Sequence, residues 1–294
     1  MAAVSPPTLW LLGSSMYSAH LAAAKGLPYV FAHHFSGQGT EEALATYREE
    51  FRPSEFADKP TTFMTVNACV AETRDEAEQL IRTDPAVRVL VFQGHETVFS
   101  AGNDIADFLN HPPETADAPV FQFLRAVADF SKPMIAAVSG PAVGIGTTLL
   151  FHCDLVYAGD NAAFSMPFVN LGLCPEAASS LLVPQMLGYH RAAEALLLGE
   201  PFFAEAALEV GLVNRVLPPT ECNGVAQAQA KKLAAKPLSS LIETKRLMKK
   251  HQLPQIAAVM AEEGASFGRM LREPAAREAF GAFMEKRHPD FSKV

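Results

Sequence analysis

Short apolar runs alternate with segments of helical spacing along the first third of the chain. Three apolar runs have the length of strands and lie at residues 8–14, 27–35 and 63–71. Two segments with helical spacing, 18–26 and 41–53, lie between them. Strands that alternate with helices are typical of a parallel sheet, so this pattern predicts an α/β unit.

Two later apolar runs each lead through a glycine-bearing turn into a helical pattern. The run at 87–93 leads into FSAGNDIADF at 99–108, and the run at 133–139 leads into GPAVGIG and a predicted helix over 147–158. A chain that turns sharply from a strand into a helix leaves backbone N–H groups without acceptors. Two such groups that converge on one point would form an oxyanion hole, with a helix dipole aimed at the same point.

One carboxylate stands close to this region, in the segment NLGLCPEAASSLLVP at 170–184. A base beside an oxyanion hole is the arrangement that proton transfer through an enolate requires, and Glu176 is the candidate. Apolar neighbours favour a raised pKa for this carboxyl. The alternative is that Glu176 only caps the helix predicted at 177–187. For Asp104, after the first turn, capping is the expected role.

Composition and charge narrow the class of protein. The chain has 294 residues, 49% of them hydrophobic, and a net charge of −8 with no basic run suited to nucleic acid. Its four cysteines have no zinc-like spacing, which predicts free thiols in a reducing compartment and no metal site. No basic leader or apolar run of membrane-spanning length is present, so we expect a cytoplasmic protein that binds no membrane.

Residues 8–80 resemble part of a bacterial luciferase-like flavin monooxygenase. The resemblance rests on LWLLGSSMYSAHLAAAKGLPYVFAHHF, YREEFRPS and FMTVNACVAETRDEAEQL. That family folds as a (β/α)₈ barrel, which needs about 250 residues. We therefore expect residues 1–82 to be an incomplete, atypical βα segment fused to a second domain, and we expect no bound FMN.

Residues 84–294 resemble the crotonase (enoyl-CoA hydratase/isomerase) superfamily, and within it the Δ3,Δ2-enoyl-CoA isomerases. The motifs lie in the family's order at 84–108, 132–188, 202–218 and 275–291. The resemblance implies an α/β domain over 83–294, a spiral of ββα units with C-terminal helices from about residue 220. It also implies an acyl-CoA thioester substrate, no cofactor apart from the coenzyme A of that substrate, and a homotrimer or hexamer. In such assemblies Phe283 and Lys286 would approach coenzyme A of a neighbouring subunit.

The resemblance also assigns residues to the site. It puts the oxyanion donors at the amides of Asn103 and Ile145, and it puts substrate contacts at Ala101, Gly102, Gly144, Phe168 and Leu171, with Phe151 and Phe164 as further candidates for an acyl pocket. Hydratases of this superfamily use two glutamates, and this chain has Thr148 and Phe168 at those positions. Isomerases use one glutamate, which corresponds to Glu176.

The sequence therefore favours isomerisation of a 3-enoyl-CoA to a 2-enoyl-CoA by Glu176. Two other interpretations stay open. One is another acyl-CoA reaction on the same oxyanion hole, such as hydration or thioester hydrolysis. The other is a fusion protein that binds acyl-CoA without turnover.

Overall fold

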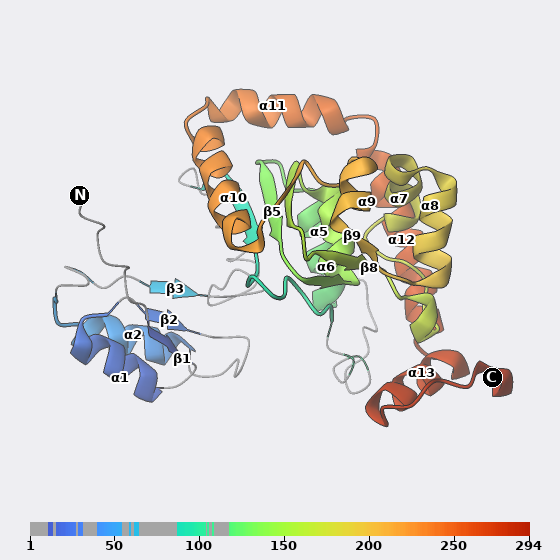
Figure 1. Cartoon of the computed structure of the whole chain (residues 1–294), viewed down its shortest axis with the longest axis horizontal. Coiled ribbons are helices and arrows are strands. Elements are labelled where there is room, and N and C mark those ends of the chain that lie inside the picture. The colour runs from blue at the N-terminus through green and yellow to red at the C-terminus, as the bar shows by residue number, and fades with distance from the viewer. Residues whose placement is uncertain are drawn as a thin grey trace. The chain divides into compact units, whose positions relative to one another are not determined.

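The computed structural model describes residues 11–13, 16–27, 29–31, 40–54, 59, 62–64, 87–103, 105, 108 and 118–294. The chain divides into two compact units, Met1–Ile81 and Arg82–Val294. Figure 1 shows the first unit in blue and the second from green to red.

The first unit is a small parallel βαβαβ arrangement. Its elements are β1 (Leu11–Gly13), α1 (Met16–Lys25), β2 (Tyr29–Phe31), α2 (Thr40–Glu50) and β3 (Thr62–Met64). The sheet order is β1-β2-β3, and both pairs are parallel. The five elements overlap the five segments read from the sequence, with α1, α2 and β3 beginning one or two residues earlier, and the parallel sheet agrees with the alternation of strands and helices.

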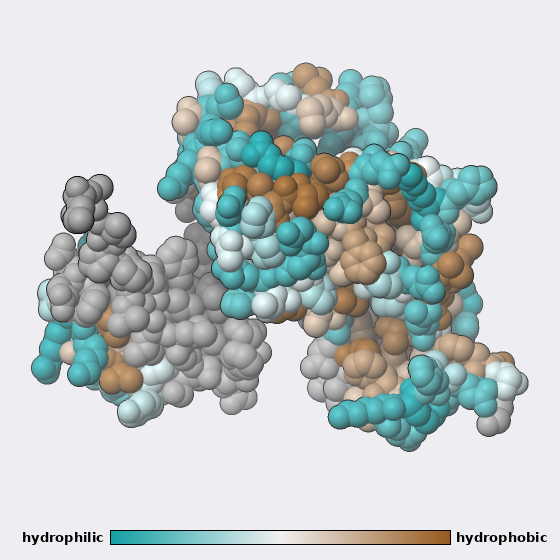
Figure 2. Space-filling model, in the orientation of Figure 1, coloured by the Kyte–Doolittle hydropathy of each residue, from teal (hydrophilic) through white to brown (hydrophobic). Residues whose placement is uncertain are grey.

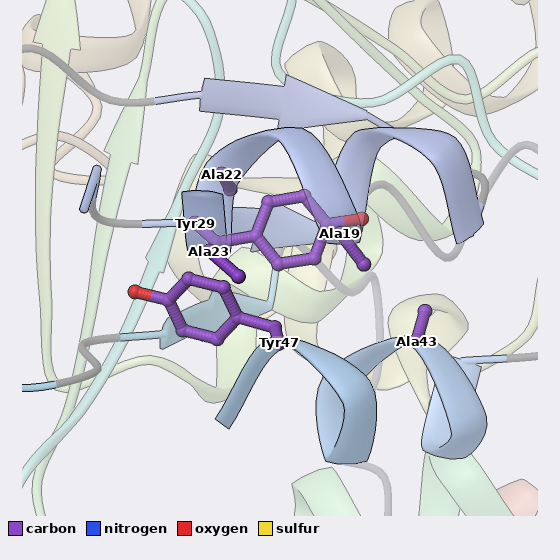
Figure 3. Close-up of a cluster of buried hydrophobic side chains, with 6 residues drawn as sticks. All are labelled: Ala19, Ala22, Ala23, Tyr29, Ala43 and Tyr47. Carbon is purple, nitrogen blue, oxygen red and sulfur yellow. The ribbon is translucent and has the colours of Figure 1, made fainter. Parts of the chain in front are cut away.

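Two tyrosines and four alanines form the core of this first unit (Figure 3). The rings of Tyr29 and Tyr47 lie 5.3 Å apart and are tilted by 40°. The Tyr29 hydroxyl is 2.8 Å from Ser18 Oγ, and the Tyr47 hydroxyl donates to the carbonyl of Leu27 at 3.0 Å. Small side chains on α1, such as Ala22, allow the tyrosine rings to pack closely while both buried hydroxyls keep a partner.

The second unit contains two sheets. Its strands are β4 (Leu90–Gln93), β5 (Met134–Val138), β6 (Pro141–Val143), β7 (Leu155–Gly159), β8 (Ala163–Ser165), β9 (Phe202–Phe203) and β10 (Arg215–Leu217). One sheet has the order β10-β7-β5-β4 and is parallel throughout. The other has the order β6-β8-β9, with β6 and β8 parallel and β9 antiparallel to β8.

The helices of the second unit follow these strands. They are α5 (Pro119–Ala128), α6 (Ile145–Thr148), η2 (Leu149–His152), η3 (Val169–Leu171), α7 (Ser179–Leu187), α8 (Tyr189–Ala193), η4 (Glu194–Leu198), α9 (Ala204–Glu209), α10 (Pro219–Ala234), α11 (Leu238–Lys249), α12 (Leu253–Met270), α13 (Pro274–Met284) and η5 (Phe291–Lys293).

Successive ββα units share the two sheets in the same way. β5 and β7 lie in the first sheet, and β6 and β8, which follow them directly, lie in the second. Each pair leads to a helix, α6 after β6 and α7 after β8. Ser100, ten residues after the start of β4, forms a parallel bridge with Ala142 of β6 and so joins the second sheet in the same sense. The turn after each second-sheet strand is therefore presented at one edge.

The core of the second unit is a sheet covered on both faces. All five residues of β5 are buried, which is typical of a central parallel strand. On one face Ile135 and Ala137 pack with Cys222 and Ala226 of α10, and Figure 1 shows α10 beside β5. Residues such as Met134 and Ala136, which alternate with these, are also fully buried and therefore pack on the opposite face.

Helix α11 is anchored to the body of the unit by a buried lysine. Lys245 Nζ donates to Asp154 Oδ2 at 2.7 Å and to the carbonyl of Lys132 at 2.9 Å, and the lysine is 7% exposed. Asp154 Oδ2 also accepts from the N–H of Met134 at 2.8 Å. These bonds tie α11 to the start of β5.

Below α11 in Figure 2, apolar surface extends between α10 and α9.

One predicted element is wrong. The helix expected over 147–158 ends at His152, because Cys153 is extended (φ −69°, ψ 147°) and residues 155–159 form strand β7. The run LVYAG has β-branched and aromatic residues and pairs with β5 on one side and β10 on the other. A short apolar run does not separate a buried strand from a buried helix by periodicity alone.

Candidate functional site

The two glycine-bearing turns lie side by side. The N–H groups of Phe99 and Ser100 donate to the carbonyl of Pro141 at 3.0 and 3.1 Å, and the N–H of Val143 donates to the carbonyl of Ser100 at 2.9 Å. These backbone bonds fix the turn after β4 against the turn after β6.

Glycine is required where the turns touch. Gly102 has φ +88°, and a Cβ there would lie 3.0 Å from the Val143 carbonyl oxygen. A Cβ on Gly146 would lie 2.7 Å from Ser100 Cβ. Side chains at these positions would push the turns apart.

The two predicted donor amides stand at the ends of these turns. Ile145 is the first residue of α6, after Gly144 with φ +56°. The N–H groups of Thr147 and Thr148 return to the Gly144 carbonyl. Asn103 is exposed and lies one residue beyond Gly102. In the described part of the chain, neither the Asn103 N–H nor the Ile145 N–H donates to another protein group. The helix behind Ile145 is shorter than expected, which reduces the contribution of its dipole.

Glu176 is buried and bonded through one oxygen only. Its Oε1 accepts from Thr148 Oγ1 at 2.6 Å, the residue is 5% exposed, and no described group donates to Oε2. Thr148 lies three residues after Ile145, which is about 4.5 Å along a helix axis. The hydrogen bond therefore places the carboxyl beside the first turn of α6.

Glu176 does not cap α7. Its side chain bonds Thr148, and only its backbone carbonyl accepts from Ser179, through the N–H at 3.0 Å and Oγ at 2.5 Å. Between Glu176 and α7, Ala177 and Ala178 both have left-handed conformations, with φ +59° and +55°. For a residue with a Cβ this costs roughly 1–2 kcal/mol each, so surrounding contacts must hold the turn.

Two buried side chains hold this turn. Glu263 of α12 accepts from the N–H of Ala178 at 2.6 Å and from the N–H and Oγ of Ser180 at 2.9 and 2.5 Å. His152, 1% exposed, donates from Nε2 to the carbonyl of Ala177 at 2.7 Å. The acid that satisfies the N-terminus of α7 is therefore Glu263.

Burial shifts the titration of these groups. Burial raises the pKa of Glu176 to about 8; the Thr148 hydrogen bond opposes this, and the nearby Glu263 carboxylate adds to it. Burial also lowers the pKa of His152 to about 4, so the ring is neutral near pH 7. The pKa of Glu263 is raised by burial and lowered in part by its three hydrogen-bond donors.

A pocket of about 880 Å³ opens beside Glu176. Its walls come mainly from α5 and α12, and Glu176 and Glu263 both line it. Apolar and small side chains make up most of these walls, including Phe121, Leu124, Met260, Gly264 and Gly268. The pocket therefore brings apolar walls next to a buried carboxyl whose Oε2 has no hydrogen-bond partner among the described residues.

The other predicted contacts lie outside the lining of this pocket. Phe151, Phe164 and Phe168 are buried, Leu171 is half-buried, and the lining of this pocket includes none of the four. Phe164 instead stacks on Phe202 at 5.4 Å. Ala101 is exposed beside Gly102, and Asp104 lies outside the described residues. Phe283 is 58% exposed on α13 and Lys286 follows that helix, so their approach to coenzyme A stays a prediction.

The sequence pattern does not identify Glu263 or His152. It indicates for Thr148 only that a glutamate expected in hydratases is absent, and not that Thr148 contacts Glu176. A signal for Glu263 exists, because it continues the apolar stripe of Ile256, Met260 and Phe267 on α12. An acid on the buried stripe of a helix requires a partner. No comparable signal links Thr148 to Glu176.

The described residues also bear on the predicted metal, cysteine and membrane properties. In the described ranges no group of three or more His, Cys, Asp and Glu residues is placed to hold a metal ion. The described cysteines, Cys153, Cys174 and Cys222, are free. Within the same ranges, no helix combines the length and apolar character that crossing a membrane requires. The cytoplasmic location, the absence of a cofactor and the luciferase-like origin of the first unit stay predictions.

Comparison with known proteins identifies the family. Residues 59–293 match the enoyl-CoA hydratase/isomerase family model, so the match begins before the predicted domain start at 83. The chain is 38% identical over 187 residues to enoyl-CoA delta isomerase 2 of Rattus norvegicus, covering 62% of this chain and 48% of that protein. It is 31% identical over 226 residues to 2,3-dehydroadipyl-CoA hydratase of Escherichia coli K12, covering 76% and 88%.

Solved structures agree with this match. Pseudomonas aeruginosa OdaA is 49% identical, with a TM-score of 0.69 over 71% of this chain and 85% of that one. An enoyl-CoA hydratase/isomerase of Pseudoalteromonas atlantica is 37% identical, with a TM-score of 0.69 over 74% and 86%.

The relatives include proteins named as isomerases and as hydratases, and the chain spans 46% to 63% of the length of three enoyl-CoA delta isomerases from rat, mouse and human. The chain shares the crotonase fold with these structures. The chain therefore belongs to the enoyl-CoA hydratase/isomerase family.

Proposed function

We propose that this protein is an acyl-CoA double-bond isomerase that converts 3-enoyl-CoA to 2-enoyl-CoA with Glu176 as its single acid–base group. The observation that carries the proposal is the state of this carboxyl. It is buried, bonded through Oε1 alone, and lines an apolar pocket with Oε2 unpartnered among the described residues.

The reaction needs one proton to leave C2 and one to arrive at C4. Glu176 removes the C2 proton, and the electrons move into the thioester carbonyl to form an enolate. The N–H groups of Asn103 and Ile145 would donate to the enolate oxygen, and each such donor contributes roughly 2.7–4 kcal/mol. Glu176 then returns its proton to C4 as the double bond moves to C2–C3. A carboxyl with a pKa of about 8 is suited to accept and return a proton near neutral pH.

The neighbouring side chains argue against hydration by two carboxylates. The family resemblance puts Thr148 and Phe168 at the positions of the two hydratase glutamates, and neither side chain titrates near neutral pH. Glu263 does not replace them, because both of its oxygens already accept hydrogen bonds from Ala178 and Ser180. One available carboxyl supports isomerisation over addition of water.

The acyl chain would occupy the pocket between α5 and α12. This places the reacting carbons at Glu176 and the tail against Phe121, Leu124 and Met260. Coenzyme A would lie toward the two turns that present the Asn103 and Ile145 amides.

We also infer a homotrimer or hexamer. Large apolar side chains on the second unit support association, since Tyr189 is 72%, Leu197 67% and Phe203 59% exposed. Sedimentation analysis of the purified protein tests this, and a monomer at micromolar concentration would rule it out.

Glu176→Gln tests the base. With a 3-enoyl-CoA as substrate, formation of the conjugated thioester should fall about 10²–10⁴-fold, while the affinity for acyl-CoA stays nearly unchanged. Glu221→Gln, at an exposed carboxylate on α10, is the matched control and should retain full turnover. Full activity in Glu176→Gln would remove the base assignment.

The same substrate separates the other functions. Appearance of a hydroxyacyl-CoA would indicate hydration, and release of free thiol would indicate thioester hydrolysis. Tight binding of acyl-CoA without any product would indicate a binding protein.

A further inference from the structure

A second buried carboxylate faces the loop that carries Glu176. Glu263 is 7% exposed and comes from α12, 85 residues after Ala178. Both of its oxygens are used: Oε2 accepts from the Ala178 N–H, and Oε1 accepts from the N–H and Oγ of Ser180. These bonds make Glu263 an acceptor with little capacity left to act on a substrate.

The groups that Glu263 binds belong to a turn in an unfavourable backbone conformation, which contacts from other elements must stabilise. Ala177 and Ala178 have left-handed backbone conformations. Because they directly follow Glu176, these conformations fix the direction of the Glu176 side chain. On the other side of the same turn, His152 binds the Ala177 carbonyl. The turn is therefore held between a donor on η2 and an acceptor on α12.

We propose that Glu263 is a positioning residue for Glu176, which fixes the Ala177–Ala178 turn and thereby directs the free oxygen of Glu176 at the substrate. The proposal rests on the proposed function of Glu176. It goes beyond that function because it assigns a task to a carboxyl that touches no reacting atom.

The charge of Glu263 adds a measurable effect. It raises the pKa of Glu176, in the same direction as burial. The other titratable groups near the Ala177–Ala178 turn are His152 and Cys174. His152 is neutral near pH 7 because burial lowers its pKa, and burial raises the pKa of the Cys174 thiol. The remaining titratable groups that line the pocket are Arg125, Asp129, Arg269, Arg272 and Glu273. Loss of the Glu263 charge should therefore lower the pKa of Glu176.

Glu263→Gln is the decisive variant. It keeps the shape of the side chain but removes the charge and places an amide N–H₂ against a backbone or hydroxyl donor. We expect kcat to fall about tenfold or more with KM for acyl-CoA nearly unchanged, because the turn that carries Glu176 moves while the apolar pocket walls on α5 and α12 stay. We also expect the rising limb of kcat/KM against pH to move to lower pH. Glu262→Gln, the adjacent exposed carboxylate, should alter neither quantity.

Two further variants keep the test valid if Glu263→Gln folds poorly. Ser180→Ala removes one of the three donors and should lower kcat by a smaller factor at unchanged KM. Glu263→Asp keeps the charge but withdraws it, so kcat should fall while the pH limb stays closer to that of the wild type.

The outcomes separate this proposal from the proposed function. Lower stability with unchanged kcat and an unchanged pH limb would make Glu263 a structural residue only and overturn the proposal. If Glu176→Gln is inactive but Glu263→Gln is not impaired, positioning fails and the base assignment stands. If Glu176→Gln is fully active, the base assignment itself fails.

Discussion

Thr148 Oγ1 donates a hydrogen bond of 2.6 Å to Oε1 of Glu176, and Oε2 of the same carboxyl has no partner in the described part of the chain. The two residues are 28 positions apart, on α6 and on the loop before α7. The bond orients the carboxyl and lowers its pKa against the larger effect of burial, which leaves that pKa at about 8. In the proposed reaction Thr148 therefore orients the carboxyl that acts as the base.

Replacing Thr148 by valine should make Glu176 a harder acid to ionise. A hydrogen bond to a charged group contributes about 1.5–3 kcal/mol, so its loss should raise the pKa by about 1–2 units. The rising limb of kcat/KM should move to higher pH, with a loss of roughly 10–100-fold at pH 7 and a smaller loss at high pH. Steady-state kinetics across the pH range measure this.

Thr148→Ser keeps the hydroxyl donor and is the control for that experiment. It should retain the wild-type pH limb. An equal loss of activity at all pH values in Thr148→Val would contradict the proposed hydrogen-bond effect.

Much of the framework was predictable because local pattern and packing agree there. The alternation of apolar runs and helical segments placed β1 to β3 with their helices, and the runs at 87–93 and 133–139 contain β4 and β5. Gly102 marked a tight turn, and the Val143 carbonyl passes close to it. These features depend on neighbours in sequence or on steric limits of one residue.

The rest depends on contacts between distant segments. Nothing local distinguishes LVYAG as a strand until β5 and β10 lie on both sides of it. The hydrogen bonds from Ala178 and Ser180 to Glu263 join residues more than 80 positions apart. The pocket beside Glu176 likewise forms mainly from α5 and α12, which are distant from Glu176 in the sequence.

The buried carboxyl should also make stability depend on pH. The pKa of Glu176 is about 8 in the folded protein and near 4.5 in the unfolded chain. Between these values the folded state holds a proton that the unfolded chain releases, so the free energy of unfolding falls as pH rises, by at most about 1.4 kcal/mol per pH unit from this group.

Glu176→Gln removes this titration. The variant should become more stable than the wild type as pH rises from 5 to about 8, and the difference should level off above that value. Urea unfolding at a series of pH values measures the difference, and the titration of His152 cancels because both proteins contain it. A difference that does not change with pH would show that Glu176 is not a buried acid of raised pKa.

Gly146→Ala should damage turnover more than folding. Its Cβ would lie 2.7 Å from Ser100 Cβ and 3.1 Å from Ser100 Oγ, so the turns that present the Asn103 and Ile145 amides must separate. Loss of one oxyanion donor lowers kcat about 10²–10³-fold. Gly224→Ala on α10 has no atom within 4 Å of the new Cβ, so it should keep full turnover and gain about 0.5–1 kcal/mol of stability. A wild-type kcat in Gly146→Ala would contradict the proposal that the Asn103 and Ile145 amides on these turns stabilise the enolate.

Gly268→Leu should shorten the acyl chain that the enzyme accepts. Gly268 lines the pocket, and no atom lies within 4 Å of a Cβ built on it, so a leucine there fills pocket space without a clash at its first atom. A long acyl chain would then clash with the leucine, whereas a short acyl chain would still fit with its reacting carbons at Glu176. The ratio of kcat/KM for dodec-3-enoyl-CoA to that for hex-3-enoyl-CoA should fall about tenfold or more, the effect of roughly two displaced methylenes. Gly281→Leu on α13 also has open space at its Cβ but lies outside the pocket lining, and it should leave the ratio unchanged. Equal loss for both substrates in Gly268→Leu would place the acyl tail somewhere other than between α5 and α12.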